Sequence, residues 1–233
     1  MDFVTDSSDS NVMDWDGAYR GEGGFDGAPP WNIGEPQPEL AALIAAGKVR
    51  GEVLDAGSGH AELSLALAAK GYTVVGIELS PTAVAAATKA AQERNLPNAT
   101  FVQDDITTFT GFDGRFDTVV DSTLFHSLPV EGRDGYQQSV YRAAAPGAVY
   151  YILVFAKGAF PPEELQQKPN EVDEPELRAA VGKYWEIDEI RPAFIHANMP
   201  SGPDVPFQLP PHDKDDKGRT KMPAFLLTAH KAG

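Results

Sequence analysis

The stretch Glu52-Val-Leu-Asp-Ala-Gly-Ser-Gly-His60 decides the fold that this sequence predicts. Its apolar pattern predicts a short strand over residues 51–56 and a helix over residues 62–70, with two glycines in the turn between them. Glycine is required where a backbone bends sharply or a ligand comes close, and the N–H groups that begin the helix point at whatever lies above the turn. Ala61 replaces the third glycine of a dinucleotide-binding loop, so this motif is weak by itself.

Later strands end in acidic residues. We expect them at residues 72–78, 99–102 and 116–121, and an apolar fifth strand at 148–155. The acids at the first four strand ends are Asp55, Glu78, Asp104 with Asp105, and Asp121. Because ligands of open parallel sheets bind beyond the carboxyl ends of the strands, these acids predict an acidic rim there. Glu78 follows Asp55 at about the 20-residue offset at which an acid reaches a ribose in nucleotide-binding units.

An acidic rim suits a cationic ligand with a ribose, an adenine and an ammonium group better than a phosphate. Four motifs in order resemble those of class I S-adenosylmethionine-dependent methyltransferases: VLDAGSGHAELSLALA, VVGIELSP, FVQDDI and FDTVVDSTLFHSL. The resemblance covers roughly residues 14–157. It implies an α/β fold with a single Rossmann-like, doubly wound sheet of seven strands, mostly parallel with an antiparallel C-terminal strand. It also implies S-adenosylmethionine as cofactor and S-adenosylhomocysteine as product.

Composition limits the classes of binding partner that this chain can have. A formal net charge of −15 and the lack of a basic cluster argue against nucleic acid. Without cysteine there is no thiol nucleophile or disulfide. No apolar run reaches the ~18–20 residues of a membrane span, and no signal pattern precedes the domain. We therefore expect a cytoplasmic protein with a small-molecule substrate, no membrane partner and, by default, a monomeric state.

The chain is expected to form one domain over residues 11–233, preceded by a disordered tail over 1–10. Further helices are expected at residues 38–48, 81–94, 131–145 and 174–183, and C-terminal strands at 185–190 and 222–230. A long loop covers residues 200–221, and such loops are usually functional or mobile.

The aromatic residues of segment 11–38 allow two interpretations, a hydrophobic strap over the domain or a lid over the cofactor. This segment resembles the N-terminal pattern of methyltransferases of the thiopurine and thiol type, where it closes over S-adenosylmethionine. The resemblance implies that Trp31 lies against the cofactor and places Trp15 and Tyr19 nearer the substrate.

The same resemblance assigns the other cofactor residues. The methionine half of the cofactor is expected to bind Asp55, Gly57, Ser58 and Gly59, and the ribose is expected to bind Glu78. The adenine is expected to contact Leu79, Ile106 and either Asp104 or Asp105. Asp121 and Ser122 are expected beside the methyl group. One of the two adjacent acids caps the segment 106–109, and Asp105 is favoured over Asp104 for the adenine.

Methyl transfer from a sulfonium is an in-line displacement that requires positioning and exclusion of water rather than a triad or a metal. The five histidines show no metal-ligand spacing, so no metal is expected. His126 is the candidate for acid–base catalysis, beside Asp121, because imidazole titrates near neutral pH. The alternative is a histidine that lines the pocket or bonds to the next helix. Phe125 and His196 complete the expected substrate pocket, and His196 has the core as its alternative location.

The pattern resembles most the bacterial methyltransferases that detoxify heterocycles such as N-hydroxyquinolones by O- or N-methylation. Thiol, halide or tellurite acceptors stay open, because relatives with the same N-terminal pattern use them. A protein that binds S-adenosylmethionine without catalysis and a nicotinamide-dependent oxidoreductase are the rival interpretations. The missing third glycine and the acid row argue against the oxidoreductase.

Overall fold

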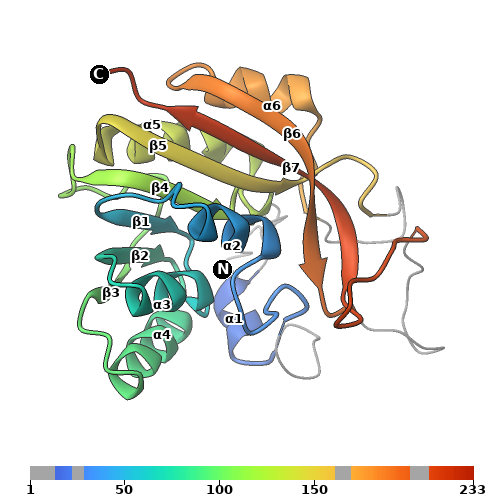
Figure 1. Ribbon diagram of the computed structural model, residues 1–233, viewed down its shortest axis with the longest axis horizontal. Coiled ribbons are helices and arrows are strands. Elements are labelled where there is room, and N and C mark those ends of the chain that lie inside the picture. Colours follow the sequence, from blue (N-terminus) through green and yellow to red (C-terminus); the bar gives the residue numbers. More distant parts are fainter. Residues whose placement is uncertain (1–13, 23–28, 161–168, 200–209) are drawn as a thin grey trace, which may run out of the picture.

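A seven-stranded sheet forms the centre of the computed structural model, which describes residues 14–22, 29–160, 169–199 and 210–233 (Figure 1). Its order is β3-β2-β1-β4-β5-β7-β6. The strands are β1 (Val53–Ala56), β2 (Val74–Glu78), β3 (Ala99–Gln103), β4 (Phe116–Ser122), β5 (Ala144–Phe155), β6 (Glu186–Ala197) and β7 (Thr220–His230). The first five pair in parallel, and β7 is antiparallel to both β5 and β6. The predicted fold class is confirmed.

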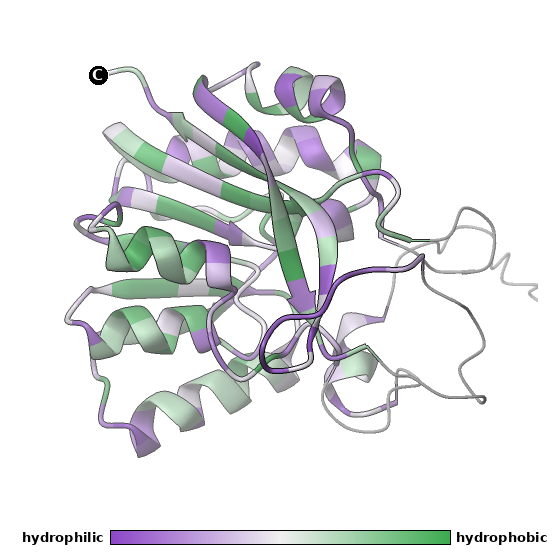
Figure 2. Cartoon of the chain, turned by 45° about the vertical axis from the view of Figure 1, so that its right-hand side comes forward, coloured by the Kyte–Doolittle hydropathy of each residue, from purple (hydrophilic) through white to green (hydrophobic). Residues whose placement is uncertain are grey.

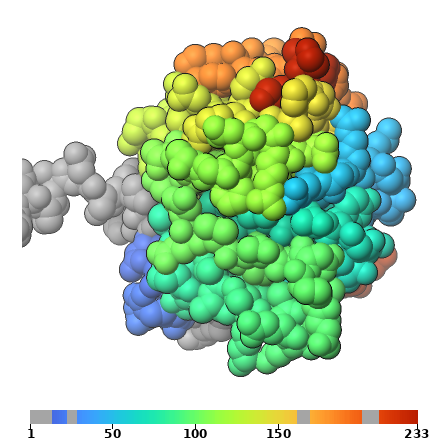
Figure 3. All heavy atoms as spheres, turned by 90° about the vertical axis from the view of Figure 1, so that its left-hand side faces the viewer, coloured from blue at the N-terminus to red at the C-terminus, as the bar shows by residue number. Residues whose placement is uncertain are grey.

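Helices cover both faces of the sheet. In the described residues they are α1 (Trp15–Tyr19), α2 (Pro38–Ala45), α3 (Glu62–Ala69), α4 (Pro81–Glu93), α5 (Arg133–Ala143) and α6 (Glu174–Val181), with the 3₁₀ turns η1 (Phe125–Ser127) and η2 (Val130–Gly132). One face carries α2, α3 and α4, and the other carries α5 and α6 (Figure 1). Figure 3, viewed from the left of Figure 1, shows α6 (orange) and the C-terminal residues (red) above the α4 and β3 region (green).

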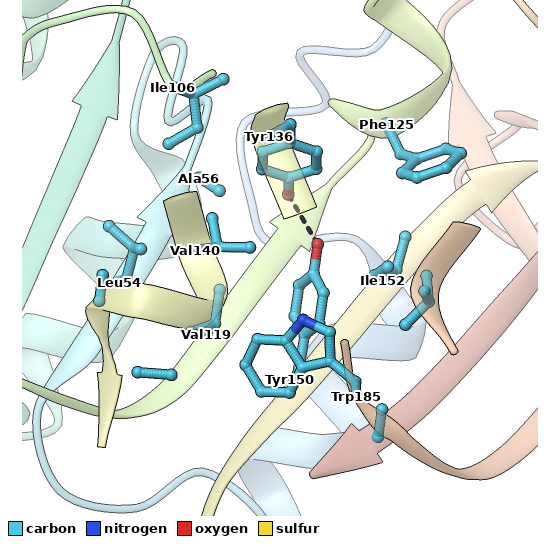
Figure 4. Packing of buried hydrophobic residues seen from close by; sticks show 14 of the residues in the cluster. Leu54, Ala56, Ile106, Val119, Phe125, Tyr136, Val140, Tyr150, Ile152 and Trp185 are labelled. Carbon is cyan, nitrogen blue, oxygen red and sulfur yellow. Dashed lines mark hydrogen bonds between the residues drawn. The ribbon is translucent and has the colours of Figure 1, made fainter. Parts of the chain in front are cut away.

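Alternation along each strand builds two cores. Tyr150, Ile152 and Val154 of β5 pack toward α5 and α6, whereas Tyr151 and Leu153 pack toward α2 and α3. This alternation follows from the two-residue period of a strand. Because both faces are covered, the strands carry many hydrophobic residues, and Figure 2 shows green both along the strands and on the helices beside them. Figure 4 shows the first core, where the Tyr150 hydroxyl donates to that of Tyr136 at 2.9 Å and the Trp185 ring lies against Tyr150.

The expected boundary between the fifth strand and the helix before it was wrong. The helix expected over residues 131–145 spans Arg133–Ala143, and β5 begins at Ala144 and runs through the Pro146-Gly147 pair. An irregularity in the β4–β5 register accommodates that pair, and Gly147 has a φ of +72°.

The strand expected over residues 185–190 continues as β6 to Ala197. It includes Pro192, which is tolerated because β6 lies at the edge of the described sheet, where its one neighbouring strand is β7.

Several expectations lie outside the described residues. They are the disordered tail over 1–10 and much of the long loop over 200–221, of which 210–221 is described. No helix of the described ranges has the length and apolar character that crossing a membrane requires.

Candidate active site

A cavity of about 1950 Å³ lies beyond the carboxyl ends of the parallel strands. Gly57 follows β1, Glu78 ends β2, Asp105 lies after β3 and Ser122 ends β4, and all four line it. The sheet therefore brings residues from four separate segments to one edge. The expected site residues that line the cavity are Trp15, Tyr19, Trp31, Asp55, Gly57, Ser58, Gly59, Glu78, Leu79, Asp105, Ile106, Ser122 and His126.

The loop after β1 needs its glycines. Gly57 and Gly59 have φ values of +68° and +50°. A Cβ at Gly57 would lie 2.7 Å from Cδ1 of Leu124, and one at Gly59 would lie 2.7 Å from the hydroxyl of Tyr19. Ala61 also takes a positive φ, 64°, where the sequence lacks the third glycine. The loop thus closes tightly under the cavity.

Two buried acids support this loop. Asp55 accepts a hydrogen bond from the Ser64 hydroxyl at 2.6 Å, and burial raises the pKa of Asp55 to about 6. Glu78 is 7% exposed, and its two oxygens accept the N–H groups of Gly59 and Ser80, both at 2.9 Å. Burial raises the pKa of Glu78, while these N–H groups favour the ionised form. Each carboxylate oxygen keeps a second lone pair for a ligand in the cavity.

An apolar slot adjoins Glu78. Leu79 is 56% exposed beside it, and Ile106 and Asp105 face the cavity from the turn after β3. Asp104 does not line the cavity, and its side chain accepts the N–H of Asp105. Asp105 Oδ1 accepts the N–H and the hydroxyl of Thr107 at 2.8 and 2.7 Å, so the acid that we expected at the adenine is also the one that caps the segment 106–109. Asp104 is not placed as a ligand residue.

Aromatic side chains of the N-terminal segment lie over the glycine loop. The Trp15 and Trp31 rings meet edge to face at 5.8 Å, and the Tyr19 ring lies 4.8 Å from that of His60. Helix α1 is held there by Asp16, which accepts hydrogen bonds from the Ser80 hydroxyl and the Thr82 N–H at the start of α4. The segment is thus anchored to the domain next to Glu78.

Asp121 and Phe125 were expected in the site, but the structure buries both below it. Asp121 is 0% exposed and accepts hydrogen bonds from the Leu124 and Phe125 N–H groups and the Tyr136 hydroxyl. Burial raises the pKa of Asp121 to about 7. The side chain is occupied in positioning the segment after β4, and the sequence could not show this because Tyr136 comes from α5.

His126 lines the cavity, but its geometry argues against the expected role as a base. Its Nδ1 accepts the Phe155 N–H at 3.2 Å, which leaves the proton of the neutral ring on Nε2. Burial, reinforced by the nearby Arg133 cation, lowers the pKa of His126 to about 3. A neutral imidazole with Nε2–H is a hydrogen-bond donor at neutral pH.

His196 was also expected in the substrate pocket, and the structure places it elsewhere. Its Nδ1 lies 2.7 Å from Asp215 Oδ2, and its backbone exchanges two hydrogen bonds with the side chain of Gln37. Arg219 bridges the same Asp215 and Glu35, each at 2.6 Å. His196 therefore joins the β6–β7 end to residues 35–37, which line the cavity.

Several lining residues were missed by sequence reasoning. Arg133 begins α5, Phe155 ends β5, and Phe160, Asn170 and Met199 come from connecting segments. No motif marks them, although the position of Phe155 at a strand's carboxyl end was a usable signal.

Comparison with known proteins agrees with this architecture. A family model described as a methyltransferase domain matches residues 53–147. The 2-heptyl-1-hydroxyquinolin-4(1H)-one methyltransferase of Mycobacteroides abscessus is 51% identical over 225 residues, covering 95% of this chain and 98% of that protein. A probable thiol methyltransferase of Arabidopsis thaliana is 32% identical over 133 residues, 55% of this chain and 58% of its own.

Solved structures show the same fold. One, from work on the conversion of a disulfide bond into a thioacetal group during echinomycin biosynthesis, has a TM-score of 0.78 and 32% identity, covering 94% of this chain and 91% of its own. The Burkholderia thailandensis 1,6-didemethyltoxoflavin-N1-methyltransferase, solved with bound 1,6-didemethyltoxoflavin and S-adenosylhomocysteine, has a TM-score of 0.59 at 19% identity, covering 84% of this chain and 77% of its own.

Proposed function

The chain belongs to the S-adenosylmethionine-dependent methyltransferases, and from this premise we propose that it methylates an oxygen or nitrogen atom of a small heterocyclic aromatic acceptor of the hydroxyquinolone type. The observation that carries the proposal is the cavity beyond the glycine loop. Trp31, Phe155, Phe160 and Met199 give its walls aromatic and apolar surface, beside polar groups such as His126 and Asn170. Apolar walls with few polar groups are typical of sites for flat organic ligands.

The residues present fit the cofactor. The carboxylate of Glu78 can take two ribose hydroxyls in parallel, and the slot between Leu79 and Ile106 suits an adenine, with Asp105 at its amino group. The glycine loop lines the cavity where the methionine half would bind, and the buried Ser58 hydroxyl there has no partner among the described residues. When bound, S-adenosylmethionine supplies an electrophilic methyl group.

The protein's own residues position the acceptor and exclude water. Trp15 and Trp31 cover the loop, and Phe155 packs on the ring of His126 with centroids 4.4 Å apart. These walls hold the acceptor in line with the methyl carbon and reduce the solvation of its nucleophilic atom. With its proton on Nε2, His126 donates a hydrogen bond that orients the substrate, and it removes no proton from the substrate.

A small molecule suits this chain better than nucleic acid, because its net charge of −15 repels a phosphate backbone. The single domain over residues 11–233, the monomeric state and the cytoplasmic location stay predictions.

The test combines binding and turnover. Calorimetric titration should show micromolar binding of S-adenosylmethionine and S-adenosylhomocysteine and none of NADH. Mass spectrometry should then detect a methylated product from 1-hydroxyquinolin-4(1H)-one at a higher kcat/KM than from aryl thiols, iodide or tellurite. Preference for a thiol would favour the thiol methyltransferase alternative. Tight cofactor binding without turnover of any acceptor would instead favour a binding protein without catalysis.

A further inference from the structure

Arg133 is a half-buried cation in the cavity wall with unused hydrogen-bonding capacity. Its Nη2 donates to the Asn170 carbonyl oxygen at 2.8 Å, whereas Nε is buried and has no partner. Among the described residues Nη1 also has no acceptor, and no carboxylate lies within ion-pairing distance of Arg133. Burial lowers the pKa of Arg133, and Glu176 opposes that shift from a distance. A buried donor without a partner requires an explanation, and a ligand acceptor is one.

The other cations of the cavity wall differ from Arg133. Lys157 pairs with Asp173 at 2.8 Å and Glu176 at 3.0 Å, and Lys183 pairs with Asp134 at 2.5 Å. In the described part of the wall, Arg133 is therefore the cation without an anionic partner.

Arg133 is held in one orientation. Its guanidinium carbon lies 4.6 Å from the centre of the Phe125 ring, a cation–π geometry. Asn170, which accepts from Nη2, also donates its N–H to the His126 carbonyl oxygen at 2.7 Å and its side-chain amide to the Leu128 carbonyl oxygen at 3.0 Å. Asn170 thus fixes Arg133 and the segment that carries His126 relative to each other.

His126 supplies a second fixed donor on the same wall. Because the Phe155 N–H occupies Nδ1, the Nε2–H is left without a partner among the described residues, and the ring is held against Phe155. The nearby Arg133 cation further disfavours protonation of this ring. Two side chains with unused N–H donors, one of them charged, therefore line one cavity.

We propose that Arg133, with the Nε2–H of His126, binds the nucleophilic atom of the acceptor as an anion and so sets the enzyme's preference for ionisable acceptors. This inference rests on the proposed function and adds a substrate class to it, namely acids such as N-hydroxy heterocycles. The proton of the acceptor's O–H leaves to water upon binding. The oxyanion then forms a bond to the methyl carbon as the carbon–sulfur bond breaks, and the electron pair of that bond stays on sulfur. A general base is unnecessary.

The experiment measures the ionisation of bound acceptor. 1-Hydroxyquinolin-4(1H)-one is titrated from pH 5 to pH 9 in the complex with S-adenosylhomocysteine, and its absorption spectrum reports the anion. A cation beside an acid lowers the acid's pKa by roughly 1–3 units, so bound acceptor should ionise at a pH about one unit or more below that at which free acceptor ionises. The charged and titratable groups that line the cavity with Arg133 come from each neighbouring element. They are His126 of η1, Glu131 of η2, Asp134 of α5, Glu176 of α6, Lys183 after α6, and Lys157 and Glu171 of the connecting segments.

The variants isolate Arg133. Arg133→Gln should return the apparent pKa of the acceptor toward its free value and raise KM about 10- to 100-fold, and Arg133→Lys should restore part of the shift. Arg142→Gln is the matched control, because Arg142 lies on the same helix over the Phe109 ring but pairs with Asp113 outside the cavity. It should leave the bound acceptor's pKa unchanged. Quinolin-4(1H)-one, which lacks the N-hydroxyl, should bind wild type and Arg133→Gln within about threefold of each other.

The outcomes separate the two proposals. If the acceptor binds with an unshifted pKa, or if Arg133→Gln changes neither pKa nor KM while S-adenosylhomocysteine still binds, the anion-binding role is wrong and the proposed function stands. If wild type binds S-adenosylhomocysteine but neither binds nor methylates the hydroxyquinolone, the proposed function fails and this inference fails with it.

Discussion

Replacing Glu78 with glutamine tests the cofactor assignment directly. The carboxylate holds the Gly59 and Ser80 N–H groups at 2.9 Å and, in our proposal, accepts two ribose hydroxyls on its remaining lone pairs. An amide has one acceptor oxygen, so the Glu78→Gln variant loses one ribose bond and turns a donor toward a backbone N–H.

The expected loss of cofactor affinity follows from the negative charge of the Glu78 carboxylate. Hydrogen bonds to charged groups contribute about 1.5–3 kcal/mol. The loss of one such bond and the weakening of another should cost about 2–4 kcal/mol, which corresponds to an increase in Kd of about 30- to 1000-fold. Calorimetric titration with S-adenosylhomocysteine measures this change.

A matched variant and a matched ligand isolate the ribose. Glu52→Gln removes a carboxylate at the opposite, amino end of β1, where Glu52 pairs with Arg115, and should leave Kd unchanged. The 2′,3′-dideoxy analogue of S-adenosylhomocysteine should bind wild type and Glu78→Gln with similar affinity. Unchanged binding of the full ligand by a folded variant, or an equal loss for the dideoxy analogue, would refute the ribose assignment.

Two further perturbations concern stability. The raised pKa of Asp121, about 7, means that the folded state binds its proton more tightly than the unfolded state, so its contribution to stability falls as pH rises from about 4 to 7, by at most about 1.4 kcal/mol per unit. The pKa of His126, lowered to about 3, has the opposite effect, and its contribution to stability rises from about pH 3 to 6.5. The test therefore subtracts the free energy of unfolding of Asp121→Asn from that of wild type at each pH. This difference should decrease from about pH 4 to 7, and a constant difference would contradict the raised pKa of Asp121. Asp215→Ala should lower the melting temperature and raise KM for the methyl acceptor more than Kd for the cofactor, because Asp215 joins the β6–β7 end to the cavity wall through hydrogen bonds from His196 and Arg219. These hydrogen bonds lower the pKa of Asp215 although burial acts to raise it. A variant with unchanged melting temperature and KM would show that this network does not support the site.

The cofactor half of the site was predictable because its signals are local. A tight turn demands glycine at Gly57 and Gly59, and parallel strands place Glu78 and Asp105 at one edge once their order along the chain is known. The positions of the acids along the sequence therefore indicated that they lie together at one edge of the sheet.

The acceptor half was harder to predict because its residues meet only through packing. Arg133 begins a helix, Phe155 ends a strand and Asn170 lies in a connection, and nothing in their spacing relates them. The sequence likewise placed Asp121 in the site beside the methyl group, although the Tyr136 hydroxyl, from a different element, occupies one of its oxygens beneath the cavity.

By itself, the sequence indicated the strands and the glycine loop, because strand periodicity and turn chemistry act between residues close in the chain. The order of motifs that resembles a known family indicated the seven-stranded sheet and the type of cofactor. Only the tertiary structure decided the protonation and direction of the groups that face the acceptor. The Phe155 N–H selects the tautomer of His126, and the absence of a carboxylate partner in the described wall leaves the charge of Arg133 available. Protonation and available charge depend on hydrogen bonds and burial in the folded protein, so they cannot be predicted from composition and spacing.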